Sequence, residues 1–473
     1  MAKFCCLATT ATPPPNPPPT GPTRLGGIDR WFEVTARGTD YRTEVVGGIT
    51  TFLTMVYIVF VNPSILSGTA DLSGVKLGFD QVLAVTALAG GLLTIAMGVF
   101  GKYPFALASG LGLNAFAAAE VAAHRVTWSS MMGIFVIDGA VIIVLVVLGL
   151  RERIIDAIPF DLKLGIGIGI GAFITVVGLK NAGFVISGGE LGTLGTHLGT
   201  WKMLVFALGL LVTWGLVQRG VRGALLFGIL GATVVATVIN AIDSQHIWTD
   251  GTARLPQGAW LTTPDLSLAD GSHVGFHFGV LGGSAVAVIL AVIMSDLFDN
   301  VGTSISVGRN AGLLDDQGRL PRIRTALGID GLAALLGGFM SASSNTTFIE
   351  SNAGVAAGAR TGLASVVTGA LLLLCMFISP IAGIIPTEAT ASALVIVGVM
   401  MFSLVRDLRW DNASPLAVFA TIIVMPVTYS IANGVGVGIL LHTAGEILNR
   451  RRVNPLLIAF SGFFVWYFLH GTI

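Results

Sequence analysis

Beyond Glu44 the chain alternates between long apolar stretches and short polar segments. The stretches are about 16–24 residues long, the length of helix that crosses roughly 30 Å of hydrocarbon. The first predicted spans cover residues 44–66, 82–100, 104–123, 130–150, 160–180, 201–218 and 222–241. The second set covers 278–301, 323–341, 343–358, 361–381, 386–404, 414–430 and 432–448. A last apolar stretch, 454–471, fits either a further span or a helix at the membrane interface.

The two sets of spans share short sequence matches in the same order. Thr86-Ala87-Leu88 reappears as Thr325-Ala326-Leu327, and Gly139-Ala140 reappears as Gly369-Ala370. Because each half has an odd number of spans, the second half enters the membrane from the opposite side, as in the inverted repeats of secondary transporters. We therefore expect an all-α polytopic membrane protein with 14 spans in a 7+7 inverted repeat.

The expected organisation has five parts. A Pro-rich tail, expected to be disordered and cytoplasmic, covers residues 1–40. The first repeat covers 41–241 and the second repeat covers 276–448, with an extracytoplasmic loop at 242–275 between them. A basic loop and the C-terminal apolar segment cover 449–473.

Composition and charge support a multi-pass protein of the cell membrane. The chain of 473 residues is 53% hydrophobic and 11% charged, whereas a soluble domain has about 25% charged residues. The net charge of zero gives no reason to expect a nucleic-acid partner. If the predicted spans simply alternate in direction, every loop that is rich in Lys and Arg lies on the same side of the membrane as the N-terminus. The loop 242–275, on the other side, holds only Arg254. This distribution predicts a cytoplasmic N-terminus.

Two segments in corresponding positions are too short and too polar for ordinary spans. They run from Ala108 to Phe116 and from Ser341 to Val355. Interrupted spans of this kind mark the substrate site of a transporter. We expect each to begin extended and to continue as a half-helix whose N-terminal amides face a solute.

Acidic residues at membrane depth are the second indication of a site. Asp296 and Asp299 are three residues apart and share a helical face, and Glu350 lies in the second broken segment. A buried carboxylate is costly, so it usually persists for a function such as carrying a proton. The structural alternative is a buried pair or a helix cap. For Asp138 and Asp330 a structural hydrogen bond is at least as good an explanation.

The sequence lacks the motifs of metal sites, of nucleotide-driven pumps and of intramembrane enzymes. The three cysteines and seven histidines show no metal-ligand spacing, and no GxxxxGK[ST] nucleotide motif is present. The spans contain no Ser–His or Cys–His pair that would indicate an intramembrane enzyme. We expect a transporter without a cofactor rather than an enzyme.

Four motifs in order resemble the AzgA-like hypoxanthine/guanine/adenine permeases, a branch of the nucleobase–cation symporter superfamily. They are the run from Glu44 to Pro63, Gly110-Leu-Gly112-Leu-Asn114-Ala-Phe116, Asp296-Leu-Phe-Asp299-Asn300-Val-Gly302-Thr303 and Phe348-Ile-Glu350-Ser351-Asn352-Ala-Gly354-Val355. The resemblance covers nearly everything from Phe32 to the end. It implies fourteen spans, with spans 1–4 and 8–11 as a core, spans 5–7 and 12–14 as a gate, and broken half-helices at spans 3 and 10. It also implies proton symport and a homodimer.

The resemblance places a purine between the third, eighth and tenth spans. It implies substrate-binding roles for Asn114, Asp296 and Glu350, to which we add Gly112 through its backbone and Phe116 or Phe348 as a stacking ring. The coupled proton is expected on Asp296, Asp299 or Glu350. One departure is the stretch Ser343-Ser344-Asn345, where a glycine is expected, and this puts the preferred purine in question. The rival interpretation is an inorganic anion transporter of the same broad fold, such as a sulfate or bicarbonate carrier.

Overall fold

The structure is a computed structural model that describes most of the chain. It describes residues 27–150, 158–186, 193–195, 199–242, 247–248, 252–255, 259–276, 285–314, 320–408 and 415–470. The prediction of a disordered tail at 1–40 therefore lies mostly outside the described residues.

Helices occupy the predicted spans. Up to residue 242 they are α1 (Gly27–Phe32), α2 (Tyr41–Met55), α3 (Ile58–Leu66), α4 (Phe79–Ala96), α5 (Leu111–Ala122), α6 (Trp128–Val147), α8 (Phe160–Asn181), α9 (Trp201–Gln218) and α10 (Ala224–Ile242). Beyond it they are α11 (Ala285–Asn310), α12 (Ile323–Phe339), α13 (Ser351–Ala356), α14 (Gly362–Leu374), α15 (Ser379–Ala382), α16 (Thr387–Phe402), α17 (Pro415–Thr428), α18 (Ile431–Leu448) and α19 (Pro455–His470).

The expectation of an all-α protein needs a small correction, because short strands are present. β1 (Leu107–Ser109) pairs antiparallel with β4 (Asn345–Thr347), and β2 (Val185–Ile186) pairs with β3 (Thr193–Leu194). Two predicted spans are also interrupted: the first divides into α2 and α3, and the span at 361–381 divides into α14, a short 3-10 turn and α15. The protein is therefore mostly helical.

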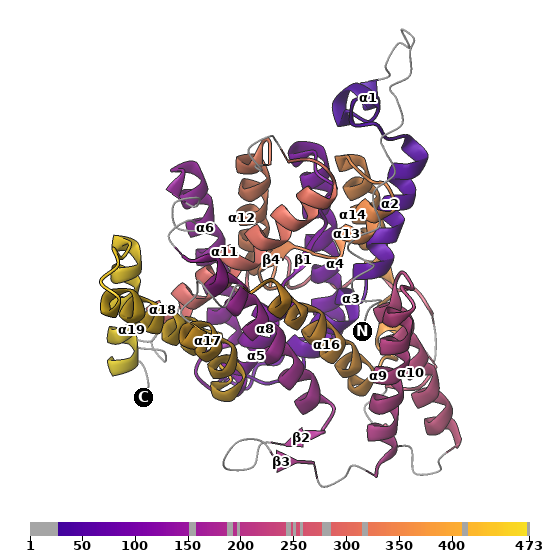
Figure 1. Cartoon of the computed structure of the whole chain (residues 1–473). Coiled ribbons are helices and arrows are strands. Elements are labelled where there is room, and N and C mark those ends of the chain that lie inside the picture. The colour runs from indigo at the N-terminus through magenta and orange to yellow at the C-terminus, as the bar shows by residue number, and fades with distance from the viewer. Residues whose placement is uncertain are drawn as a thin grey trace.

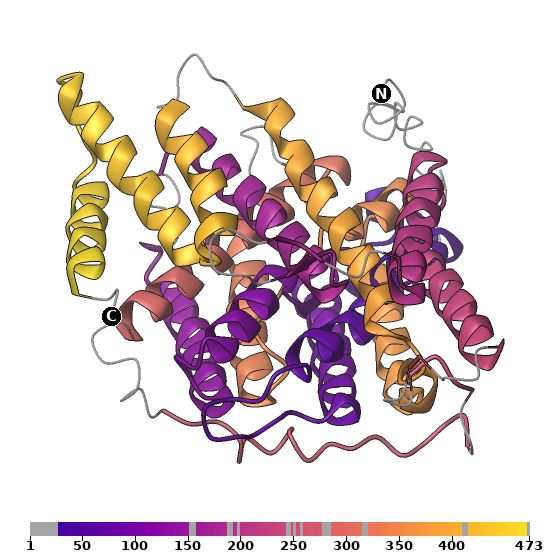
Figure 2. The same ribbon diagram turned by 90° about the horizontal axis from the view of Figure 1, so that it is seen from below.

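The helices surround the β1–β4 pair. Figure 1 shows these strands near the middle of the molecule, and the structure brings α4, α12 and α11 into contact with them. Both views place α9 and α10 together at one end and α18 and α19 at the other (Figures 1 and 2). The strands are thus enclosed by helices, where polar backbone is protected from lipid.

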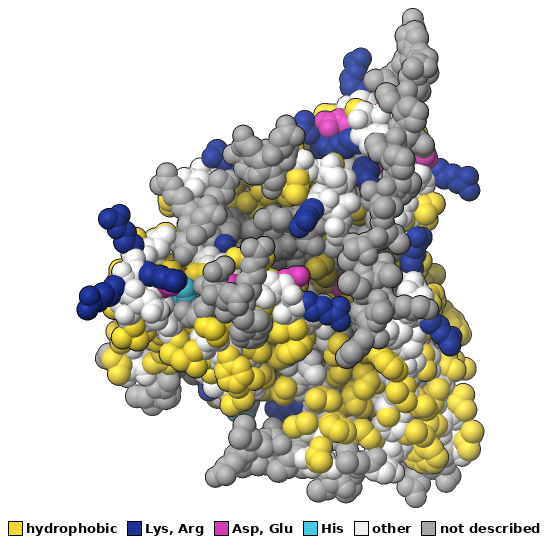
Figure 3. Space-filling view, viewed as in Figure 1, with side chains coloured by type: hydrophobic (Ala, Val, Ile, Leu, Met, Phe, Trp, Pro, Cys, Tyr) yellow, Lys and Arg dark blue, Asp and Glu magenta, His cyan; other side chains and the backbone are white. Residues whose placement is uncertain are grey.

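The outer helices present apolar side chains outward. Eight helices in the described part are long and apolar enough to cross a membrane. In Figure 3 hydrophobic side chains form a wide band over the lower part of the molecule, and exposed examples include Leu211 of α9, Val234 of α10 and Phe419 of α17. An apolar surface of this extent is typical of contact with lipid.

Glycines allow the inner helices to pack closely. A Cβ on Gly139 of α6 would lie 2.2 Å from the backbone nitrogen of Leu335 in α12. The glycine run of α8 serves the same purpose, because a Cβ on Gly169 or Gly171 would meet α17 or α16 within 2.8 Å. The glycines of this run therefore permit close packing of α8 against α16 and α17.

Candidate functional site

The two broken segments meet at the β1–β4 pair. In its antiparallel register Leu107 lies opposite Thr347, and Ser109 lies opposite Asn345. Each strand leads directly into a helix, α5 after β1 and α13 after β4. The expectation that both segments begin extended and continue as short helices is confirmed. The N-terminal ends of α5 and α13 therefore start next to one another in the protein interior.

The polar backbone of this crossing is satisfied by side chains and by the other segment. The N–H of Ala106 donates to Ser351 Oγ at 3.0 Å, and the N–H of Leu107 donates to Thr94 Oγ1 at 2.8 Å. The N–H of Phe348 donates to the carbonyl of Ala106 at 2.8 Å. Such pairing is what permits extended backbone at membrane depth.

Asn114 is buried in the first turn of α5. Its Oδ1 accepts a hydrogen bond of 2.9 Å from Ser109 Oγ, which lies 2.8 Å from the carbonyl oxygen of Ala342. Its Nδ2 has no hydrogen-bond partner among the described residues. A buried amide of this kind has a free donor to offer a ligand.

Glu350 is the N-cap residue of α13 and is partly buried. The hydroxyl of Tyr57 donates to Glu350 Oε1 at 2.6 Å. Tyr57 is itself fully buried at the break between α2 and α3. This short hydrogen bond fixes one carboxylate oxygen and leaves the other for a different donor.

Asp296 is buried in α11. This helix contacts α5, α13, β4 and α8, so it borders both broken segments. Asp299 also belongs to α11, but its side chain lies outside the described residues. The structure thus places the elements of Asn114, Asp296 and Glu350 around one crossing.

The remaining predicted site residues lie on the same two segments. Phe116 in α5 and Phe348 after β4 are both buried. A Cβ on Gly112 would meet Ile170 of α8 at 2.7 Å, so this glycine lets α5 approach α8. Gly112 therefore has a packing role in the structure.

Two residues of this region were missed by sequence reasoning. Tyr57 lies within the first quoted motif and Ser109 within the first broken segment, but hydroxyls in apolar runs gave no sign of their partners. Glu350 is 293 residues from Tyr57, and the carbonyl of Ala342 is 233 residues from Ser109. Only the folded chain brings these groups together.

Other acids of the interior have structural partners. Ser344 Oγ donates to Asp138 at 3.4 Å, and Thr347 Oγ1 donates to Asp330 at 3.3 Å. Glu44 accepts the backbone N–H of Arg360 at 2.7 Å and that of Thr361. The structural explanation offered for Asp138 and Asp330 is thus consistent with their contacts. Among the described residues no three His, Cys, Asp or Glu side chains are grouped as metal ligands would be.

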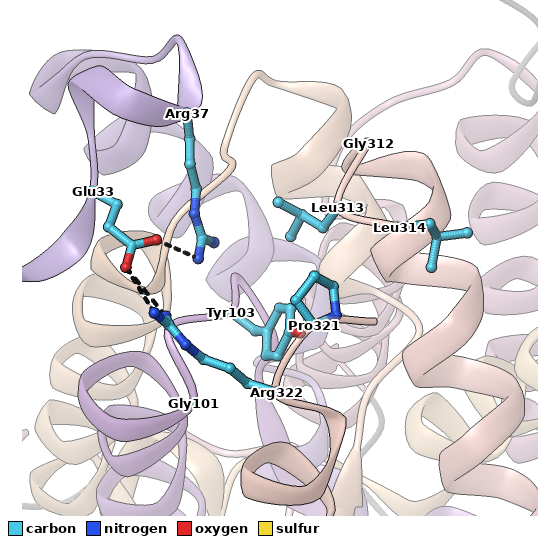
Figure 4. A pocket seen from close by; sticks show the side chains of 9 residues that line it. All are labelled: Glu33, Arg37, Gly101, Tyr103, Gly312, Leu313, Leu314, Pro321 and Arg322. Carbon is cyan, nitrogen blue, oxygen red and sulfur yellow. Dashed lines mark hydrogen bonds and ion pairs between the residues drawn. The ribbon is translucent and has the colours of Figure 1, made fainter. Parts of the chain in front are cut away.

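A cavity of about 360 Å³ lies elsewhere, at the α1 end of the molecule (Figure 4). It is lined by Glu33, Arg37, Gly101, Tyr103, Gly312, Leu313, Leu314, Pro321 and Arg322. None of the predicted substrate-binding residues lines it, so it is a separate feature.

Known proteins resemble the chain over almost its whole length. The model of the permease family (Xan_ur_permease) matches residues 42–435. The adenine permease AdeQ of Escherichia coli K12 is 36% identical over 428 residues, which cover 90% of this chain and 92% of that protein. The guanine/hypoxanthine permease PbuG of Bacillus subtilis is 36% identical over 455 residues, which cover 93% and 99%.

Solved structures share the fold at much lower identity. The transmembrane domain of a cyanobacterium bicarbonate transporter, BicA, matches with a TM-score of 0.57 at 16% identity, covering 83% of this chain and 97% of that one. The murine anion transporter Slc26a9 in its inward-facing state matches with a TM-score of 0.60 at 12% identity, covering 86% and 69%. Similarity at 12–16% sequence identity shows a shared fold and does not by itself indicate a shared function.

Proposed function

The chain belongs to the permease family (Xan_ur_permease), and from this premise we propose that it imports a purine nucleobase, namely hypoxanthine, guanine or adenine, together with protons. The observation that carries the proposal is the near full-length similarity to permeases named for adenine and for guanine and hypoxanthine. The crossing of β1 and β4 supports it, because its polar groups suit a planar heterocycle.

The proposed site matches the edges of a purine. A carboxylate accepts N–H bonds, so Glu350 and Asp296 would hold the N–H edge of the base. Asn114 would recognise a carbonyl or amino group through its free Nδ2 donor. Phe116 or Phe348 would stack on the ring, and the backbone at Gly112 would complete the site.

We further propose how the base moves. The fourteen spans would form two inverted repeats, with a core of spans 1–4 and 8–11 moving against a gate of spans 5–7 and 12–14. The proton gradient would supply the energy, and the coupled proton would be carried by Asp296, Asp299 or Glu350. The N-terminus would lie in the cytoplasm, as the distribution of Lys and Arg indicates.

The anion-carrier interpretation is less well supported. The anion and bicarbonate transporters match at 12–16% identity, which concerns the fold. An anion site also favours neutral or basic groups, whereas the proposed site contains carboxylates.

Binding of hypoxanthine to the purified protein, measured by isothermal titration calorimetry, tests the site. We expect Glu350→Gln and Asp296→Asn to weaken binding roughly 10- to 150-fold, since a hydrogen bond to a charged group contributes about 1.5–3 kcal/mol. Glu446→Gln is the matched control, because Glu446 pairs with Arg451 at the end of α18. A folded Glu350→Gln variant that binds and transports purines normally would refute the proposed role.

A further inference from the structure

A series of buried polar groups leads from α4 and α3 to Asn114. Thr86, Asn62, Ser109 and Asn114 are each at most 1% exposed. They belong to α4, α3, the end of β1 and the first turn of α5, respectively. The carbonyl oxygen of Ala342, in the segment before β4, is within hydrogen-bond distance of both Asn62 and Ser109. Each proton of this network therefore has a small number of acceptors that can be counted.

Thr86 fixes the orientation of the Asn62 amide. The Thr86 hydroxyl donates to the carbonyl of Val82 at 2.6 Å, so its single proton is used and it only accepts from Asn62. Asn62 Nδ2 lies 2.7 Å from Thr86 Oγ1 and 3.3 Å from the carbonyl oxygen of Ala342. An amide nitrogen has two protons, one for each of these acceptors. Asn62 thus supplies Ala342 with a donor whichever way Ser109 points its own proton.

Ser109 has one proton and two acceptors for it. Its Oγ lies 2.9 Å from Asn114 Oδ1 and 2.8 Å from the carbonyl oxygen of Ala342. A hydroxyl donates to only one acceptor at a time, and its lone pairs stay available to accept. Because Asn62 already donates to Ala342, the proton of Ser109 is free to go to either acceptor.

Ser109 and Asn114 therefore pair in two ways. In the donor arrangement Ser109 donates to Asn114 Oδ1, and Asn114 Nδ2 has no partner in the described part of the chain. In the acceptor arrangement Ser109 donates to Ala342, and the Asn114 amide is turned over so that Nδ2 donates to Ser109 Oγ. The two ends of an amide have nearly the same size, so both arrangements fit the same space. The Asn114 atom left for a ligand is a donor in the first arrangement and an acceptor in the second.

We infer that Ser109 is a positioning residue that lets Asn114 present either a donor or an acceptor, so that one site binds both 6-oxo and 6-amino purines. The inference rests on the proposed function, in which Asn114 meets the carbonyl or amino group of the base. The carbonyl of hypoxanthine or guanine accepts a hydrogen bond and requires the donor arrangement. The amino group of adenine donates a hydrogen bond and requires the acceptor arrangement.

Asn62 keeps both arrangements available. Without its amide, the carbonyl of Ala342 has only Ser109 as a side-chain donor in the described part of the chain. Ser109 then donates to Ala342 permanently, because a buried carbonyl without a partner is costly. Asn114 is thereby held in the acceptor arrangement. Loss of the Asn62 amide is therefore expected to favour adenine over hypoxanthine.

The dissociation constants of hypoxanthine and adenine, measured on the purified full-length protein by isothermal titration calorimetry, test the inference. We expect the unaltered protein to bind both bases. Asn62→Leu should weaken hypoxanthine binding roughly tenfold more than adenine binding, the effect of leaving one buried acceptor unpaired. Asn62→Val makes the same change with a smaller side chain, so either variant that folds is sufficient.

Ser109→Ala has a different expected result. It removes the partner of Asn114 in both arrangements, so both bases should bind roughly fivefold more weakly while the ratio of their dissociation constants stays the same. Ser64→Ala is the control, because Ser64 lies two residues from Asn62 on α3 and donates to the carbonyl of Phe60 in the same helix. It should change neither dissociation constant.

The outcomes separate this inference from the proposed function. If the unaltered protein binds only one of the two bases, or if a folded Asn62 variant leaves the ratio unchanged, the roles of Ser109 and Asn62 are overturned and the purine site stands. If the unaltered protein binds neither base, the proposed function is overturned and this inference with it.

Discussion

Tyr57 holds one oxygen of Glu350 at 2.6 Å, and this contact allows a specific test of the proposed site. Tyr57→Phe keeps the ring and removes the hydrogen bond that orients the carboxylate. Because such a bond to a charged group contributes about 1.5–3 kcal/mol, we expect the KM for hypoxanthine uptake to rise roughly tenfold or more. Tyr41→Phe, at an exposed tyrosine of α2, is the control. An unchanged KM in Tyr57→Phe would mean that Glu350 does not need this orientation.

The ion pairs of Glu33 predict how the stability of the fold depends on pH. Its pKa is lowered to about 2 from an ordinary value of 4.5, so its ion pairs with Arg37, Lys102 and Arg322 stabilise the fold above pH 4.5. That contribution is lost as the pH falls from 4.5 through 2. We expect Glu33→Gln to lower the free energy of unfolding by about 1 kcal/mol at pH 7, since these pairs are partly exposed.

The difference between Glu33→Gln and the unaltered protein is measured by thermal unfolding at pH 7, 4.5 and 3. It should shrink at the lowest pH. A difference that stays constant over this range would show that the ionised carboxylate is not its source.

Among single residues, the sequence predicts the candidate site residues Glu350 and Asn114 better than the residues that form hydrogen bonds with them. Asn114 and Glu350 stand out because polar side chains are rare in apolar segments. The hydrogen bonds from Tyr57 and Ser109 join residues hundreds of positions apart, so no local pattern indicates them. The cavity next to Arg322 is likewise formed by three distant segments.

The contact between α6 and α12 tests close packing between elements. Gly139→Ala would place a methyl group 2.2 Å from the backbone nitrogen of Leu335, which has no flexible end to move away. We expect it to lower the free energy of unfolding by about 1–3 kcal/mol. Gly328→Ala in α12 is the control, because a Cβ there meets nothing within 4 Å. Thermal unfolding in detergent would contradict this packing if the two variants were equally stable.

For the elements, span length and hydropathy predict the helices well. The two polar interruptions also predict the extended segments that form β1 and β4. The break between α2 and α3 was not predicted, because residues around Val56 and Tyr57 continue the apolar pattern. The register that places Ser109 opposite Asn345 depends on tertiary packing, which a single sequence does not reveal.

Whole-molecule topology is tested by the accessibility of single cysteines. With the three native cysteines replaced, Thr263→Cys in the loop 242–275 should react with a membrane-impermeant reagent added outside cells. Asn449→Cys, after the fourteenth predicted span, should react only after the membrane is opened. Both positions are exposed. Labelling of both from the same side would contradict the odd number of spans in the second half and the proposed inverted repeat.

Hydropathy predicts a mostly helical membrane protein, and the helices of the structure agree with that prediction. The fourteen spans, the inverted repeat and the cytoplasmic N-terminus stay predictions. Similarity to purine permeases over at least 90% of the chain then identifies the family. Neither singles out the side chain that would carry the proposed coupled proton, because Asp296 and Asp299 on α11 and Glu350 beside α13 are all carboxylates.

The most direct test is uptake of radiolabelled hypoxanthine into proteoliposomes with and without an inward proton gradient. Adenine, guanine, uracil and sulfate are added as competitors. We predict gradient-driven uptake that saturates, that purines block and that sulfate leaves unchanged. An absence of uptake for every nucleobase, or uptake indifferent to the gradient, would contradict a proton-coupled purine permease.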